Sequence, residues 1–153
     1  MDRESLICKM EKILRGELEL FHEMERCSRE QLAALSLDCP DVEKAARLMS
    51  QKQTIVDRLD ELDASSGEIK AEWQRVASEV PEEKRDRVRR LGSDMASVLE
   101  TLMALEKESE AKLRQCSTAL NRELASLQRA RLASRAYGNR YGPEDARFLD
   151  RKQ

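Results

Sequence analysis

The chain has 153 residues and a formal net charge of −2, so its overall balance does not draw it toward nucleic acid or an anionic membrane. Charged residues make up 38% of it, aromatic residues only 3%, and glycine and proline are scarce, which is typical of long helices and coiled coils. The core is therefore expected to be a narrow seam of Leu, Ile, Val, Met and Ala between helices rather than a thick globular core built on aromatic rings.

The first predicted helix runs from Glu4 to about Leu37. The spacing between its apolar residues is three, four or a sum of these steps, as on one face of an amphipathic helix. The stretch SLDCPD then interrupts the pattern. Asp38 is expected to cap the next helix, with Pro40 in its first turn.

The second run extends from Val42 to Val80 in alternating steps of three and four, which is the spacing of a coiled-coil seam. Trp73 falls in this seam, and two polar residues, Lys52 and Ser66, interrupt it. Gly67 is the expected weak point, where a kink or frayed turn would cost the least, because glycine and serine are poor helix formers.

A third run begins at Pro81 and keeps the three-four step until Leu127, after which the pattern thins. Gly92 leaves open a division into a short helix over 81–91 and a long one. From Gly138 onward no helix is expected. Short breaks between long helices predict antiparallel neighbours, so we expect an all-α, elongated antiparallel bundle of three long helices over residues 1–136 and a flexible docking tail over residues 137–153.

Catalytic and metal chemistry find little support in the sequence. His22 is the only histidine. The spacing Glu19-x-x-His22 matches one half of a carboxylate di-iron site, but the second histidine that such a site needs is missing. His22 is therefore expected at the surface beside Phe21. The four cysteines lack C-x-x-C spacing and are expected to be reduced thiols in a cytoplasmic protein. No phosphate loop, nucleophile elbow or apolar stretch of membrane-spanning length occurs, so we expect no enzyme, no cofactor, no metal and no membrane insertion.

Two basic segments are candidate binding sites. Residues 84–90 are rich in Lys and Arg, but interleaved acids and the lack of aromatic residues favour a solvated face over a nucleic-acid site. A second arginine series over 122–140 is opposed only by Glu123 and leads into RAYGNRYGPEDARFLD, which holds three of the chain's five aromatic residues. This second segment is either a docking site for an acidic or apolar protein groove or a frayed, solvated end.

Taken together, the layout resembles the FlgN-type flagellar export chaperones. The resemblance lies in two long amphipathic helices joined by a short acidic link, in LMSQKQTIVDRLDELD around Lys52, and in LNRELASLQRARLASRAYG, with Asn121 and a terminal Tyr-Gly. The chain departs from the family where Ala136 replaces the apolar residue before Tyr137, and Tyr141-Gly142 offers a second register.

The resemblance implies a cytoplasmic chaperone, without cofactor or active site, that binds late export substrates joining hook to filament and delivers them to the type III export gate. The segment from Asn121 to Ala136 would contact the substrate, and Tyr137 or Tyr141 would engage the gate. The alternative is a structural coiled-coil adaptor or stalk component of a secretion apparatus, and either protein would be a monomer or a homodimer. The expected partner-binding residues are Asn121, Leu124, Leu127, Arg131, Leu132, Tyr137 and Tyr141.

Overall fold

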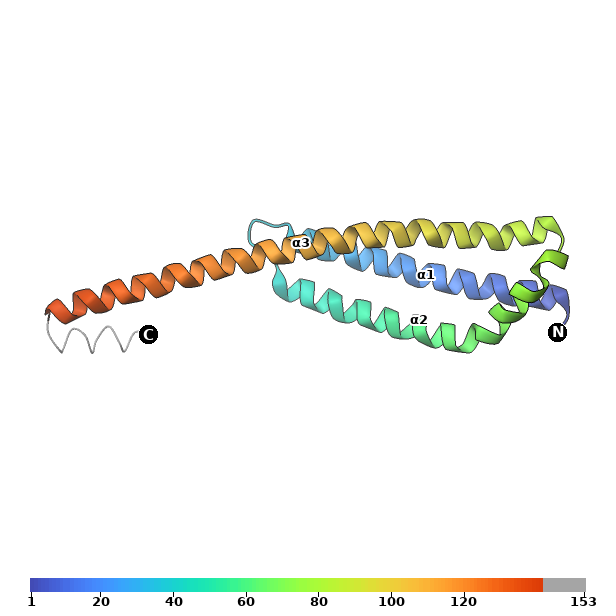
Figure 1. The fold of residues 1–153 in the computed structure, drawn as a ribbon, viewed down its shortest axis with the longest axis horizontal. Coiled ribbons are helices and arrows are strands. Elements are labelled where there is room, and N and C mark those ends of the chain that lie inside the picture. The colour runs from blue at the N-terminus through green and yellow to red at the C-terminus, as the bar shows by residue number, and fades with distance from the viewer. Residues whose placement is uncertain (142–153) are drawn as a thin grey trace. The chain divides into compact units, whose positions relative to one another are not determined.

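The computed structural model describes the backbone of residues 1–141 and the side chains of residues 1–136. It contains three long helices, α1 (Arg3–Leu35), α2 (Val42–Val76) and α3 (Glu82–Tyr141), and a short 3₁₀ helix, η1 (Ala77–Glu79) (Figure 1). This confirms the predicted all-α helical bundle. The chain divides into two compact units, Met1–Lys112 with the bundle and a second unit from Leu113 onward. The predicted division into a helical domain and a tail at 136/137 stays a prediction.

The connection between α1 and α2 differs from the prediction in its capping residue. Asp41, rather than Asp38, caps α2, because its carboxylate accepts a hydrogen bond from the backbone N–H of Lys44 at 3.0 Å. Asp41 also donates its own backbone N–H to the carbonyl of Ala34 at 3.0 Å, which ties the start of α2 to the last turn of α1. The cap therefore stands directly before the first helical residue, where its oxygen reaches the free amides of the first turn.

The third helix is continuous through Gly92, so the predicted short helix over 81–91 is not a separate element. Val88, Leu91 and Met95 pack into the core on both sides of this glycine, and this tertiary packing outweighs a local penalty of about 1 kcal/mol. At its other end α3 continues through Gly138 to Tyr141, where the sequence pattern predicts no helix. The predicted docking tail therefore begins inside a helix, and its residues 142–153 lie outside the described part of the chain.

Replacing Gly92 with alanine is expected to stabilise the bundle by about 0.5–1 kcal/mol, because the glycine is interior to a helix and an added Cβ would meet nothing within 4 Å. Urea denaturation followed by circular dichroism measures this change. The control is Ser93→Ala on the neighbouring exposed position, which should gain less. A loss of stability in Gly92→Ala would mean that α3 breaks at this point.

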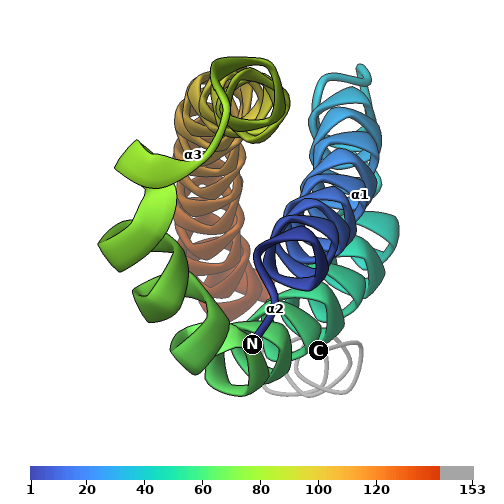
Figure 2. The same ribbon diagram turned by 90° about the vertical axis from the view of Figure 1, so that its right-hand side faces the viewer.

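The main buried cluster lies where the start of α1, the end of α2 and the start of α3 meet. Its buried members are Leu6, Ile7, Met10, Leu14, Trp73, Val80 and Val88. Trp73 is only 9% exposed, so the core is not purely aliphatic as the composition suggested. Figure 2, which looks along the bundle, shows the end of α2 swinging across toward the start of α3. Trp73 belongs to the cluster that forms there with residues of α1 and α3.

Helix α2 stays one helix through Gly67 but curves along its length (Figure 1). Just before this glycine, the hydroxyl groups of Ser65 and Ser66 donate hydrogen bonds to the carbonyls of Leu62 and Asp63 at 3.0 and 3.3 Å. Serine hydroxyls that bond back to the preceding turn often bend helices. The SSG segment therefore bends α2 rather than breaking it, and Ser66 is buried at the seam.

Candidate partner-binding surface

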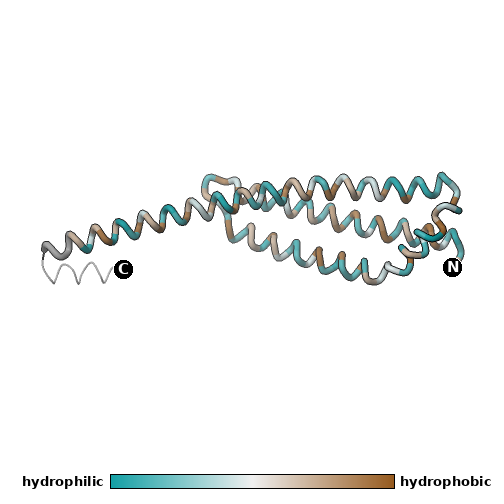
Figure 3. Tube along the Cα trace, in the orientation of Figure 1, coloured by the Kyte–Doolittle hydropathy of each residue, from teal (hydrophilic) through white to brown (hydrophobic). Residues whose placement is uncertain are grey.

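The apolar series of α3 is buried over its first part and exposed over its last. Val98, Leu102, Leu105 and Ser109 are buried. The same three-four steps continue through the partly buried Leu113 and Cys116 to three exposed leucines, which we call the leucine stripe: Leu120, Leu124 and Leu127 are 57%, 49% and 61% exposed. Apolar segments continue to alternate with polar ones along this part of α3 (Figure 3).

The three leucines of the stripe share one face of the helix, because steps of four and three return to nearly the same angle at 3.6 residues per turn. A single exposed leucine is ordinary in a folded protein. A row of exposed leucines that continues the spacing of a buried seam is different, because helices bind each other through apolar residues at this spacing. Helices α1 and α2 have 33 and 35 residues and α3 has 60, so neither of the first two helices has the length to cover α3 from end to end.

The residues predicted for partner binding do not all lie on this face. Leu124 and Leu127 belong to the leucine stripe, and Arg131 stands at the next step of four after Leu127. Leu132 is 64% exposed but lies about 100° around the helix from Arg131. Asn121 is exposed and follows the first leucine of the stripe.

Tyr137 and Tyr141 lie in the last turns of α3, and their side chains are outside the described residues. Leu120 was missing from the predicted contact residues. It belongs to the same periodic series as Leu124, and that periodicity was the signal that would have included it.

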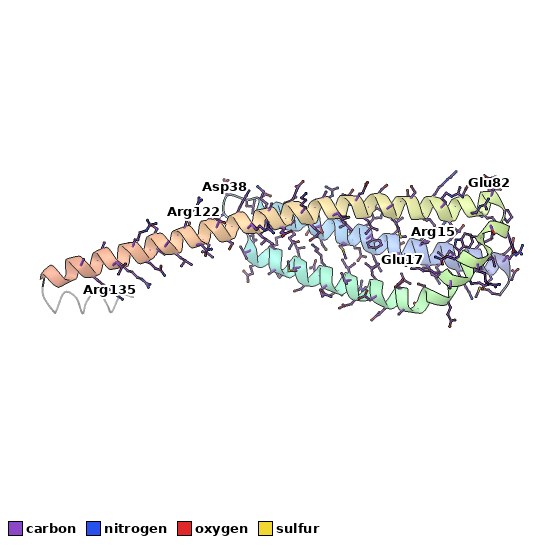
Figure 4. The ribbon with its side chains drawn as sticks, in the orientation of Figure 1. Arg15, Glu17, Asp38, Glu82, Arg122 and Arg135 are labelled. Carbon is purple, nitrogen blue, oxygen red and sulfur yellow. The ribbon has the colours of Figure 1, made fainter. Side chains whose placement is uncertain are left out.

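The part of α3 that carries the leucine stripe is strongly basic. Over residues 113–136 there are five arginines and one glutamate, Glu123, which gives a formal charge of +4. The arginines are Arg114, Arg122, Arg129, Arg131 and Arg135. All five are exposed, and Figure 4 labels Arg122 and Arg135 on this segment. The surface thus combines an apolar row with a positive field, unlike the chain as a whole.

A polar layer inside the bundle explains why Lys52 interrupts the seam. The Lys52 ammonium donates to the Gln31 side-chain oxygen at 3.1 Å and pairs with Glu106 of α3. The Ser28 hydroxyl donates to the same Glu106 carboxylate at 2.8 Å. All three long helices contribute to this layer, so it fixes their register in the way that single polar residues do in coiled coils.

A second ion pair joins α1 to the curved part of α2. Glu17 is 7% exposed, and Lys70 reaches it at 2.5 Å while also contacting Asp63 at 3.0 Å. Figure 4 labels Glu17 on α1. Burial lowers the pKa of the Lys70 ammonium, but the hydrogen bonds that the ammonium donates to Glu17 and Asp63, together with the negative charges of these carboxylates, outweigh it, so the pKa lies above its ordinary value of 10.5. The Lys70 ammonium is therefore charged at neutral pH.

Replacing Lys70 with alanine is expected to destabilise the bundle by about 1–3 kcal/mol, because the Glu17 carboxylate would stay buried without its cation. The double variant Lys70→Ala with Glu17→Leu should recover much of this loss. Because the pKa of Lys70 is raised in the folded state, its contribution is complete below about pH 10 and disappears as the pH rises through the raised value. Urea denaturation of the three proteins at pH 7 and pH 11 measures both effects, and an unchanged midpoint for Lys70→Ala would contradict them.

The remaining candidate group is His22, on the surface of α1. The His22 side chain is 54% exposed, as predicted for a surface histidine, and its Nδ1 lies 3.6 Å from Glu25. A hydrogen bond from Arg29 is the largest of the effects that hold the pKa of the Glu25 carboxyl below its ordinary value. No group of three or more His, Cys, Asp or Glu side chains in the described residues is placed to hold a metal ion.

Within the same residues, no helix combines the length and the apolar character needed to cross a membrane. Comparisons of the chain with family models, with curated proteins and with solved structures give no match. Functional proposals for this protein therefore rest on its own sequence, fold and surface.

Proposed function

We propose that this protein is a cytoplasmic helical chaperone that holds an amphipathic helix of another protein against the leucine stripe of α3. The observation that carries the proposal is the exposure of Leu120, Leu124 and Leu127 in the phase of the buried seam. The resemblance to FlgN-type chaperones suggests the partner: hook-associated proteins of the flagellar hook-filament junction, delivered to the type III export gate. Tyr137 or Tyr141 would then contact a gate component.

Burying leucines gives such a complex its binding energy. Full burial of an exposed leucine contributes roughly 1.5–3 kcal/mol. The three stripe leucines are 57%, 49% and 61% exposed, so each can supply about half of that value, which offsets part of the cost of association. A partner helix that also covers Leu113 and Cys116 would lengthen the apolar contact, because these two residues belong to the same series of three-four steps. An unpolymerised helical segment of an export substrate has the complementary shape, since its own apolar face needs cover until assembly.

A structural coiled-coil adaptor or stalk component of a secretion apparatus is the second candidate, because an exposed row of leucines in the phase of a seam can also pair two copies of a chain. The two candidates differ in stoichiometry. The chaperone forms a 1:1 complex with a helical segment of a hook-associated protein, whereas the adaptor forms homo-oligomers through the stripe. Light scattering of the full chain, alone and with that segment, separates them.

The proposal is tested by deleting residues 121–153. The compact first unit ends at Lys112, so the shortened protein should keep its bundle and most of its helical circular dichroism signal. Its complex with a terminal helical segment of a hook-associated protein should be lost in isothermal titration calorimetry. Undiminished affinity in the shortened protein would exclude the leucine stripe as the binding surface.

A further inference from the structure

The leucine series of α3 ends on a charged residue. The steps of three and four run from Leu120 through Leu124 and Leu127, and the next step of four reaches Arg131. Arg131 is exposed and is the residue of this face that would meet a partner just beyond the last leucine. The aliphatic stem of arginine can lie along an apolar row while its guanidinium reaches a carboxylate at the edge.

We propose that the occupant of the leucine stripe is an amphipathic helix of another protein whose apolar face is flanked by acidic residues, and that Arg131 selects it by pairing with one of its carboxylates. This inference rests on the proposed function and adds the charge of the partner. Two observations carry it: the formal charge of +4 over residues 113–136, and the place of Arg131 in line with the leucines.

Continuity with the buried seam argues for a helix as the occupant. Val98, Leu102 and Leu105 of the same series are covered by helices in the bundle, so a helical partner extends the packing that this face of α3 already uses. An arginine at such a position favours a planar, bidentate contact with a carboxylate, which a lysine would not reproduce.

A second copy of the chain is the less suitable occupant. Pairing two stripes brings together two segments that each carry a formal charge of +4, and in a parallel pair it places Arg131 against Arg131. Like charges facing each other across a helical interface disfavour that pairing. The same repulsion also selects against partner helices with basic flanks, so one arrangement of charge both keeps the stripe free of self-pairing and sets its preference.

The test uses the full-length protein and two designed helical peptides of about 20 residues, long enough to form a stable helix on binding. Both carry leucines at three-four spacing and differ only in their flanking residues, which are Glu in one and Lys in the other. Fluorescence anisotropy should show at least tenfold tighter binding of the Glu peptide at low salt. This preference should shrink at high salt, because salt screens exposed charges.

Arg131→Glu should reduce the preference for the Glu peptide at least about fivefold. Its matched control is Arg122→Glu, which makes the same charge change on the opposite face of α3, since nine residues correspond to two and a half turns. The control should lose far less of the preference. An equal loss in both variants would assign the preference to the general charge of the segment and overturn the role of Arg131.

Four further outcomes overturn more than that role. Equal affinity for the two peptides would refute charge selection while leaving helix binding intact. Unchanged binding of the Glu peptide after Leu124→Ser with Leu127→Ser would place the peptide away from the stripe. Failure of both peptides to bind would count against the proposed function as well, and a dimer in light scattering that is lost in the same double serine variant would identify a second copy as the occupant.

Discussion

Replacing Leu124 and Leu127 together with serine is expected to weaken the binding of a helical partner by about tenfold or more. The two leucines are 49% and 61% exposed in the free protein, so each would lose about half of the roughly 1.5–3 kcal/mol that full burial of a leucine contributes. The bundle itself should be little affected, because both residues lie outside the unit that contains its core. Calorimetric titration with a helical segment of a hook-associated protein measures the first effect, and thermal unfolding measures the second.

The matched control is Leu132→Ser. Leu132 is 64% exposed, so it resembles Leu127 in residue type and exposure, but it lies off the line of the stripe. Its replacement should change the affinity less than about threefold, a small fraction of what a buried anchor contributes. An equally large loss in Leu132→Ser would show that the partner surrounds the helix instead of lying along the stripe.

Replacing Trp73 with alanine is expected to lower the free energy of unfolding by about 3–5 kcal/mol, the usual cost of removing a large buried aromatic side chain. Trp73 is 9% exposed and packs where all three long helices meet, so no single neighbour can close the cavity. In a protein of this size, the melting temperature should fall by roughly 6–20 °C. Urea and thermal denaturation followed by circular dichroism measure this loss.

Met103→Ala serves as the comparison for Trp73→Ala. Met103 is also a large apolar residue in a helix of the bundle, but it is 73% exposed, so its truncation should cost less than about 0.5 kcal/mol. If the two variants unfolded at the same urea concentration, Trp73 would not be the core residue that its burial indicates.

Periodicity in the sequence was sufficient to predict the three helices, because each has an apolar face that repeats every three or four residues for many turns. Local rules failed where tertiary contacts decide. Gly92 has a poor helix propensity but stands between core residues, so α3 passes through it. Lys52 appeared only as an interruption, since its partners Gln31 and Glu106 are 21 and 54 residues away in the chain. No local pattern connects such residues.

For the candidate surface, too, the sequence predicts the apolar series but not which of its members are exposed. The spacing of Val98, Leu102, Leu120 and Leu127 is one continuous series in the sequence, and nothing in it separates the buried members from the exposed ones. That difference is one of tertiary packing, which buries Val98 and Leu102 but leaves Leu120 and Leu127 57% and 61% exposed. Likewise, the chain has no excess of positive charge overall, and the basic character of the stripe segment emerges only when its residues are counted by themselves.

The short connection between α1 and α2 has a consequence for the order of folding. The two helices are joined through Asp41 and Ala34, whereas α1 meets α3 through pairs such as Glu4 and Lys84, which are 80 residues apart in the chain. Closing a short loop costs less entropy than closing a long one, so α1 and α2 are expected to form a hairpin during synthesis, before α3 docks on it. The stripe leaves the ribosome later still, so a helix that binds it as proposed would meet it only after the hairpin has formed.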